Sequence, residues 1–179
     1  MILSRLLEYM ENGGIIPFKG HSKSYYENTL VELKQAKDSF FDINVAINKL
    51  KETYEKYGKI IVAYDYDDTV CPTEPIYNCD NVVKLLRLCS NFDEFEMICF
   101  TARSTPETIK EVKDNLNRLN IRYDVINDNT DRIKREIEHT HPSKVLYSIF
   151  LDDKAGLGDA YKILVEFVDW YLDQQMIID

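Results

Sequence analysis

The sequence predicts an α/β fold, a three-layer, Rossmann-like parallel sheet with helices on both faces, preceded by an α-helical N-terminal extension. After residue 58, short apolar, β-branched runs alternate with amphipathic stretches, which is typical of parallel strands joined by helices. Before it, apolar residues recur every three or four positions over a long stretch. The chain has 179 residues, enough for one hydrophobic core with an extension and too few for two full domains.

Residues 1–57 are predicted to form the helical extension. A short amphipathic helix at residues 1–10 is followed by chain-breaking Gly13, Gly14 and Pro17. From about residue 26 to 57 the apolar period predicts one long helix, roughly 45 Å in length at 1.5 Å per residue. Its apolar stripe needs cover, either from a hairpin with the first helix or from a second subunit, so a homo-oligomer through this helix is one expectation.

Residues 58–179 are predicted to form the sheet domain. Four short apolar runs read as strands buried on both faces, at residues 59–64, 96–100, 123–126 and 147–151. Helices are expected at residues 80–90, 106–119, 130–139 and across the apolar stripe of 160–172. In such sheets ligands bind beyond the carboxyl ends of the strands.

The composition favours a cytoplasmic protein that binds cations. The formal net charge is −9, and residues 1–57 are balanced, so the acidic excess lies in residues 58–179 and argues against nucleic acid as a partner. No run approaches the roughly 18 apolar residues of a membrane helix, and the N-terminus lacks the pattern of a signal peptide. The four cysteines form no CxxC pair, so a zinc site is not expected.

The residues that follow three of the predicted strands carry the functional signal. Asp65-Tyr66-Asp67-Asp68-Thr69 follows the first strand, Thr101-Ala102-Arg103 the second, and Asp152-Asp153-Lys154 the fourth. Because parallel strands end at one edge of a sheet, these carboxylates and hydroxyls are expected to converge there. Clustered carboxylates repel one another unless a hard cation neutralises them, and oxygen ligands favour Mg²⁺. The sequence therefore predicts a magnesium site at this edge.

These motifs resemble those of the haloacid dehalogenase superfamily. Its first motif, an apolar strand ending Asp-x-Asp-x-Thr, matches residues 60–69. Its second, an apolar strand ending in Thr or Ser, matches residues 97–101, and its fourth, an apolar strand ending Asp-Asp, matches residues 148–153. The resemblance covers about residues 58–175. It implies a small phosphatase: a magnesium-dependent phosphohydrolase that cleaves a small phosphomonoester through an aspartyl-phosphate.

The resemblance also implies a role for each matched residue. Asp65 would be the nucleophile, Asp67 the general acid and base, and Thr101 would hold phosphate oxygens. Mg²⁺ would lie between Asp65, the main-chain carbonyl of Asp67 and Asp152, with Asp153 nearby. Two further roles are expected near the site: Thr69 would brace the loop, and Arg103 would either contact the substrate or be a solvated residue at the start of a helix.

The phosphate-binding lysine of the third family motif stays open between Lys144 and Lys134. Lys144 stands eight positions before Asp152, as in several small family members, although Val145 replaces their proline. If residues 145–151 were all strand, however, Lys144 would lie about 25 Å from Asp152, at the wrong edge of the sheet. Lys134 is predicted near the start of a helix that begins at the correct edge. Lys144 is the favoured candidate.

No separate cap domain is expected over the site. Residues 70–80 are too few for an independent fold, and residues 102–143 hold elements that the sheet itself requires. The loop at residues 71–77 is the expected local cover, with Glu74 and Tyr77 facing the leaving group. An open site of this kind favours larger phosphoesters, such as nucleotides, over very small ones.

Three alternatives to a phosphohydrolase are weighed. A response-regulator receiver domain uses similar groups, but its acidic pair follows the first strand and its lone aspartate the third, unlike the order here. A phosphotransferase of the same fold would pass the phosphoryl group to an acceptor other than water. A non-catalytic scaffold or regulatory protein would keep the fold without needing both Asp65 and Asp67.

Overall fold

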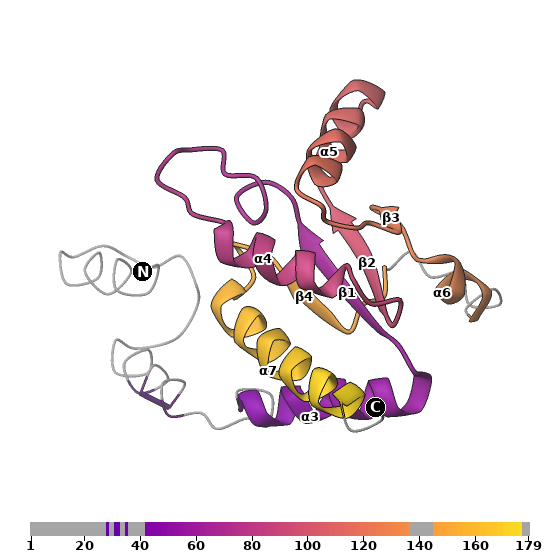
Figure 1. Cartoon of the computed structure of the whole chain (residues 1–179). Coiled ribbons are helices and arrows are strands. Elements are labelled where there is room, and N and C mark those ends of the chain that lie inside the picture. Colours follow the sequence, from indigo (N-terminus) through magenta and orange to yellow (C-terminus); the bar gives the residue numbers. More distant parts are fainter. Residues whose placement is uncertain (1–27, 29–30, 33–34, 36–41, 137–144, 177–179) are drawn as a thin grey trace, which may run out of the picture. The chain divides into compact units, whose positions relative to one another are not determined.

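The computed structural model describes residues 28, 31, 32, 35, 42–136 and 145–176 (Figure 1). The chain divides into two compact units, Met1–Asp42 and Ile43–Asp179. All the helices and strands described below belong to the second unit. In chain order they are α3 (Ile43–Tyr57), β1 (Ile60–Asp65), α4 (Asp80–Cys89), β2 (Phe95–Phe100), α5 (Pro106–Arg118), β3 (Val125–Ile126), α6 (Asp131–Glu136), β4 (Ile149–Leu151) and α7 (Leu157–Met176).

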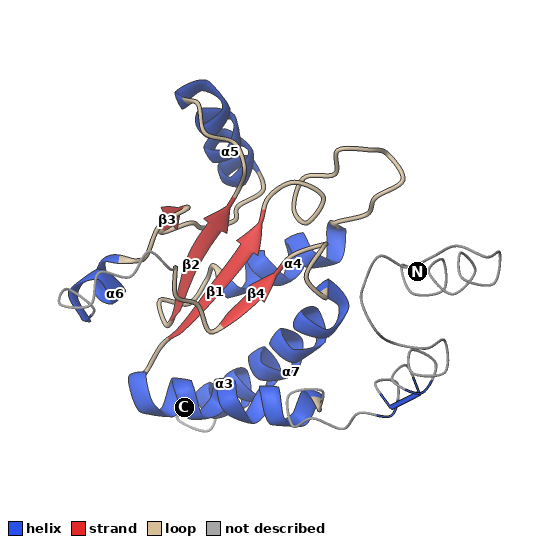
Figure 2. Ribbon diagram, turned by 180° about the vertical axis from the view of Figure 1, so that it is seen from behind, coloured by secondary structure: helices blue, strands red, loops and turns tan. Residues whose placement is uncertain are grey.

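The four strands form one parallel sheet in the order β3-β2-β1-β4. The prediction of an α/β fold built on a parallel sheet with helices is therefore confirmed. The chain moves outward in one direction from β1 through β2 to β3, then returns to the other side of β1 for β4 (Figures 1 and 2). The strand order thus reverses next to β1, and ligands in open α/β sheets bind beside such a reversal.

Alternation along β1 divides the core between the two faces of the sheet. Ile60, Val62 and Tyr64 belong to the larger core, to which α3, α4, α5 and α7 contribute buried side chains. Ile61 and Ala63 belong to a smaller core on the other face, which α6 joins through Ile133. Successive strand residues point to opposite faces, so β1 is apolar throughout because both of its faces are covered.

Two strands are shorter than predicted because side chains replace part of the strand pairing. The carboxylate of Asp124 accepts a hydrogen bond from the main-chain N–H of Met97 at 2.6 Å, and β3 begins one residue later. The hydroxyl of Ser148 accepts one from the N–H of Ile61 at 3.0 Å, and β4 begins directly after it. Both residues end the pairing at the amino end of their strand. The carboxyl ends, where the site was predicted, lie where expected.

The prediction of one long helix from about residue 26 to 57 is wrong. Asp42 forms a bend, and α3 begins at Ile43. Aspartate is favoured just before a helix because its side chain can accept bonds from the first helical N–H groups, and it is a poor residue inside one. The apolar period continues across this position, so the period alone does not reveal the break. The predicted helix at residues 1–10 lies outside the described residues.

The helix α3 packs against the last helix of the chain instead of forming part of a separate extension. The Tyr54 ring lies edge-on to the rings of Phe167, Trp170 and Tyr171, with centroids 6.2, 6.0 and 5.4 Å away. The division between the compact units accordingly falls after Asp42, whereas the sequence suggested one at Gly58. Within the described residues, none of the helices combines the length and apolar character needed to cross a bilayer.

Replacing Tyr54 with alanine should test this packing. Loss of three aromatic contacts together with the buried part of the ring should destabilise the protein by roughly 2–4 kcal/mol. Urea unfolding followed by circular dichroism measures the change. Tyr57→Ala, on the same helix but with the residue 52% exposed, is the matched control and should change stability by less than about 1 kcal/mol. Equal effects of the two substitutions would contradict the packing.

Candidate active site at the carboxyl edge of the sheet

The central strand delivers Asp65 to the carboxyl edge between two partners. Asp65 pairs in register with Phe100 of β2, and Tyr64 pairs with Leu151 of β4. The residues that follow those partners are Thr101 and Asp152. The structure therefore brings Asp65, Thr101 and Asp152 together on three adjacent strands, as the sequence predicted.

Asp65 lies in an environment that disfavours its negative charge. Its side chain is half-buried, and its pKa is raised from 3.8 to about 6, chiefly by this burial. The carboxylates of Asp152 and Asp153 also raise the pKa of Asp65, whereas the N–H of Tyr66 and the ammonium of Lys154 lower it. An anionic cluster of this kind gains stability from any added cation.

The loop after β1 is held by its own main chain. The carbonyl of Tyr66 accepts bonds from the N–H groups of Val70 and Cys71 at 3.1 and 2.9 Å, and the N–H of Asp68 donates to Cys71 at 2.8 Å. Asp68 takes the left-handed conformation with φ of 62°, which aspartate tolerates better than most residues. Its carboxylate accepts two bonds from Thr73, at 2.7 and 2.6 Å, and these lower the pKa of Asp68. Asp68 is therefore a loop-forming residue.

The second predicted catalytic carboxylate, Asp67, is paired with Arg103. The guanidinium donates to the carboxylate at 2.8 and 3.4 Å, and this bond raises the pKa of Arg103. The same guanidinium lies 5.0 Å from the centre of the Tyr66 ring and 3.3 Å from Glu111. Arg103 is thus fixed at the site by a carboxylate and an aromatic ring, so of the two alternatives for this residue the structure favours the one at the site.

Thr101 is held in place by a residue that sequence reasoning missed. Asn127 accepts a bond from the N–H of Thr101 at 2.9 Å and donates to its carbonyl at 2.8 Å. The hydroxyl of Thr101 accepts from the N–H of Arg103 at 3.1 Å. Asn127 directly follows β3, so the rule that singled out the ends of the other three strands, extended to the third, would have identified it.

The two aspartates after β4 are braced differently. Asp152 accepts a bond from the N–H of Lys154 at 2.7 Å, which closes a turn. The N–H of Asp153 donates to the hydroxyl of Thr69 at 3.0 Å, and Thr69 is fully buried. The expected bracing role of Thr69 is thus visible: it ties the loop after β1 to the loop after β4. The Asp153 carboxylate is paired with the Lys154 ammonium at 3.0 Å.

The predicted phosphate-binding lysine is not resolved by the geometry. Lys144 lies outside the described residues. Lys134 is in α6, and its ammonium forms an ion pair with Asp128. Lys154 lowers the pKa of Asp65, and the pKa of Lys154 is itself raised, chiefly by its bond to Asp153 and to a smaller extent by Asp65 and Asp152. The sequence shows Lys154 directly after Asp152 and Asp153, but it does not reveal that the Lys154 side chain turns back toward these carboxylates.

The magnesium site at this edge of the sheet stays a prediction. In the described parts of the chain, no three His, Cys, Asp or Glu side chains are placed together as metal ligands. Mg²⁺ usually binds through one or two carboxylates and retains several waters. Asp65 ends β1, Asp152 follows β4, and the carboxylate of Asp152 raises the pKa of Asp65, so these two carboxylates remain the predicted ligands.

Comparison of the chain with family models, with curated proteins and with solved structures found no match. The function is therefore inferred from the geometry of the site itself.

The raised pKa of Asp65 predicts a pH-dependent effect on stability. Asp65 has its ordinary pKa of 3.8 in the unfolded chain and a pKa of about 6 in the folded protein. The free energy of unfolding therefore falls as the pH rises from about 4 to about 6. In EDTA, Asp65→Asn should melt roughly 2–4 °C above the wild type at pH 8, which corresponds to about 1 kcal/mol. At pH 5 the difference should be about half as large, because the unfolded chain is almost fully ionised there and the folded protein hardly at all.

Calorimetry at both pH values makes this measurement. Asp114→Asn removes one exposed carboxylate from α5 with the same change in net charge, and it should show no comparable gain at pH 8. If Asp65→Asn and the wild type have the same Tm at pH 8, the charge of Asp65 does not destabilise the folded protein, and this prediction is contradicted.

Proposed function

We propose that this chain is a magnesium-dependent phosphohydrolase of the haloacid dehalogenase type, with a three-layer Rossmann-like core, that cleaves a small phosphomonoester. The observation that carries the proposal is the position of Asp65. It ends the central strand, has Thr101 and Asp152 on the neighbouring strands, and has a pKa raised to about 6 by burial and by adjacent carboxylates. A carboxylate deprived of solvent and of counter-charge is a stronger nucleophile than a hydrated one.

The reaction proposed for these residues has two steps. In the first, Asp65 attacks phosphorus, an aspartyl-phosphate forms, and the bond to the leaving oxygen breaks while Asp67 gives that oxygen a proton. In the second, Asp67 takes a proton from water, the water oxygen attacks phosphorus, and Asp65 is released with inorganic phosphate. Asp67 is suited to this work because it lies two residues beyond Asp65, on the turn that leaves the strand.

The ion pair between Arg103 and Asp67 must open when Asp67 acts as a proton donor, because a donor carboxyl is neutral. Arg103 is then available to a phosphate oxygen, whose geometry a guanidinium matches well. Thr101 is proposed to donate its hydroxyl to another phosphate oxygen, and Lys144 is proposed as the further phosphate ligand. Asp65, Asp152 and the main-chain carbonyl of Asp67, with Asp153 nearby, would hold Mg²⁺, which would supply positive charge to offset repulsion between the nucleophile and the phosphate.

Substitution of the two catalytic carboxylates tests this mechanism. Asp65→Asn should lower turnover of a phosphomonoester such as p-nitrophenyl phosphate by at least about 10³-fold, and Asp67→Asn by about 10²-fold or more, because an amide neither attacks phosphorus nor transfers the proton. Release of inorganic phosphate is the measurement. Asp68→Asn changes a carboxylate in the same loop that only accepts bonds from Thr73, and it should retain most activity. More than a few per cent activity in Asp65→Asn would refute the assignment.

Removal of the metal is an independent test. Turnover should be lost in EDTA and restored by Mg²⁺, with Ca²⁺ a poor substitute because it prefers higher and looser coordination. Mg²⁺ should also raise the Tm of the wild type, since it binds the folded acidic cluster and not the unfolded chain. That rise should be smaller in Asp152→Asn. Full activity in EDTA, or an identical rise in Tm for both proteins, would count against the metal site.

A further inference from the structure

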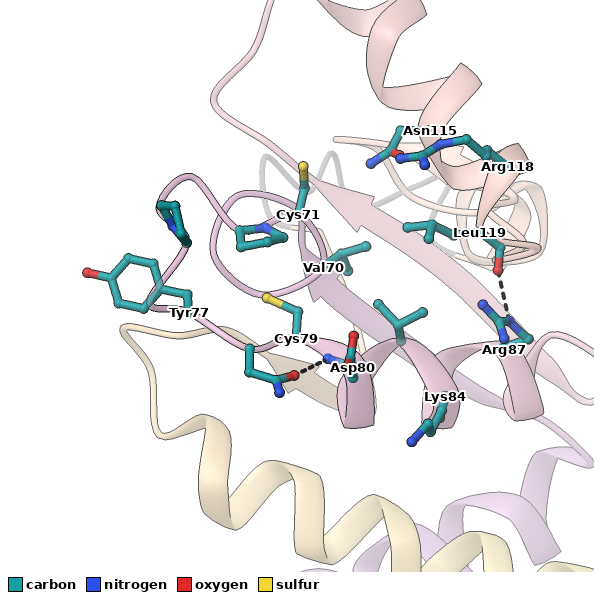
Figure 3. A pocket seen from close by; sticks show the side chains of 14 residues that line it. Val70, Cys71, Tyr77, Cys79, Asp80, Lys84, Arg87, Asn115, Arg118 and Leu119 are labelled. Carbon is teal, nitrogen blue, oxygen red and sulfur yellow. Dashed lines mark hydrogen bonds between the residues drawn. The ribbon is translucent and has the colours of Figure 1, made fainter.

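A cavity of about 520 Å³ lies beside the loop that carries the proposed acid (Figure 3). Its walls come from the loop after β1, from α4 and from α5. Val70 and Cys71 form the wall that the cavity shares with the site loop, and Cys71 forms a bridge pair with Asp67. The cavity therefore begins at Cys71, the bridge partner of Asp67.

The cavity wall is cationic in a chain that is strongly anionic. Lys84, Arg87 and Arg118 line it against a single carboxylate, Asp80, whereas the chain as a whole carries a net charge of −9. Arg87 donates to the carbonyl of Leu119 at 2.9 Å. Such a bond orients a guanidinium without neutralising it.

Arg118 is oriented in the same way. It donates to the amide oxygen of Asn115 at 2.5 Å, and Figure 3 shows the two side chains side by side on α5. Within the described residues, no carboxylate forms an ion pair with Lys84, Arg87 or Arg118. The wall of the cavity thus holds positive charge that an anionic ligand can neutralise.

A chain of contacts joins this wall to the proposed acid. The amide of Asn115 donates to the hydroxyl of Tyr66 at 2.8 Å. The ring of Tyr66 lies against the guanidinium of Arg103, which is paired with Asp67. Asn115 thus contacts both Arg118 in the cavity and the aromatic ring beneath the Arg103–Asp67 pair.

Asp65 and the cavity lie toward opposite faces of the sheet at the end of β1. Alternation along β1 places Asp65 on the face of Ile61 and Ala63, whereas Tyr66 and Val70 belong to the core on the opposite face. The loop that begins at Asp65 crosses from one face to the other, and Asp67 lies within it, paired with Cys71 at the cavity wall. A leaving group that extends past Asp67 therefore reaches the cavity.

We infer that this cavity receives the leaving group of the substrate, and that the leaving group carries a second anionic group, a phosphate or a carboxylate, which Arg118, Arg87 and Lys84 bind. The inference rests on the proposed function, since it takes Asp65 and Asp67 as the reacting groups. It narrows the substrate from any phosphomonoester to one with two anionic ends. The cavity volume of about 520 Å³ admits a molecule of the size of a sugar bisphosphate or a nucleoside bisphosphate.

Ligand binding to the full-length Asp65→Asn protein tests the inference without turnover. Isothermal calorimetry in Mg²⁺ compares matched pairs that share the reacting phosphate: fructose 1,6-bisphosphate with fructose 1-phosphate, adenosine 3′,5′-bisphosphate with adenosine 5′-monophosphate, and 3-phosphoglycerate with glycerol 3-phosphate. We expect the member with the second anionic group to bind at least about tenfold more tightly in one or more pairs. The first two pairs report a second phosphate and the third a carboxylate.

Arg118→Gln in the same background should remove most of that preference while leaving the affinity for the singly anionic member unchanged within about twofold. Lys110→Gln, an exposed cation on the same helix that is paired with Asp114 and does not line the cavity, is the matched control and should preserve the preference. Equal affinities within all three pairs would overturn the inference, as would an Arg118→Gln effect of the same size on both members.

The wild type separates this inference from the proposed function. Hydrolysis of phosphomonoesters by the wild type together with equal affinities in the Asp65→Asn protein would leave the function standing and remove the cavity's role. The opposite result is an affinity preference that Arg118→Gln removes, without hydrolysis of any of the six ligands by the wild type. It would establish the cavity as an anion-binding site and refute the proposed phosphohydrolase activity.

Discussion

The position of β1 between two parallel partners is the constraint on which the rest of the structure depends. A strand buried on both faces must be apolar along its length, so its first charged residue, Asp65, falls where the strand ends. Parallel pairing then sets Asp152 level with Asp65 and Thr101 one residue further along. The same burial that stabilises the sheet keeps water from Asp65 and raises its pKa, so the fold and the raised pKa have one physical origin.

Charge at this edge is balanced in two separate places. Arg103 neutralises Asp67 on the side of α5, and Lys154 neutralises Asp153 on the side of β4. Among the described residues, Lys154 is the cation that acts on Asp65, at longer range and against the carboxylates of Asp152 and Asp153. Asp65, the proposed nucleophile, is thus the least compensated carboxylate of the cluster, and an added cation would stabilise it most.

Periodic features of the sequence predicted the fold. The parts of the site that the sequence did not predict depend on contacts between side chains far apart in the chain. β1, β2, α4 and α5 begin within one residue of their predicted starts because apolar runs and the Thr105 cap are local signals. Asn127, by contrast, fixes Thr101 across 26 residues, and Arg103 reaches Asp67 across 36. Such pairs exist only once the chain is folded. The break at Asp42 was missed because the apolar stripe continues through it.

The connection between Ile61 and Ser148 spans 87 residues, and this has a consequence for synthesis on the ribosome. β2 emerges soon after β1, whereas β4 and α7 leave the exit tunnel later. Until then one edge of the central strand has no partner, and Tyr54 has no aromatic surface to dock on. Long-range pairing of this kind is slow to form. The acidic cluster is therefore completed only after β4 has emerged, so a chain interrupted before β4 holds Asp65 without Asp152 beside it.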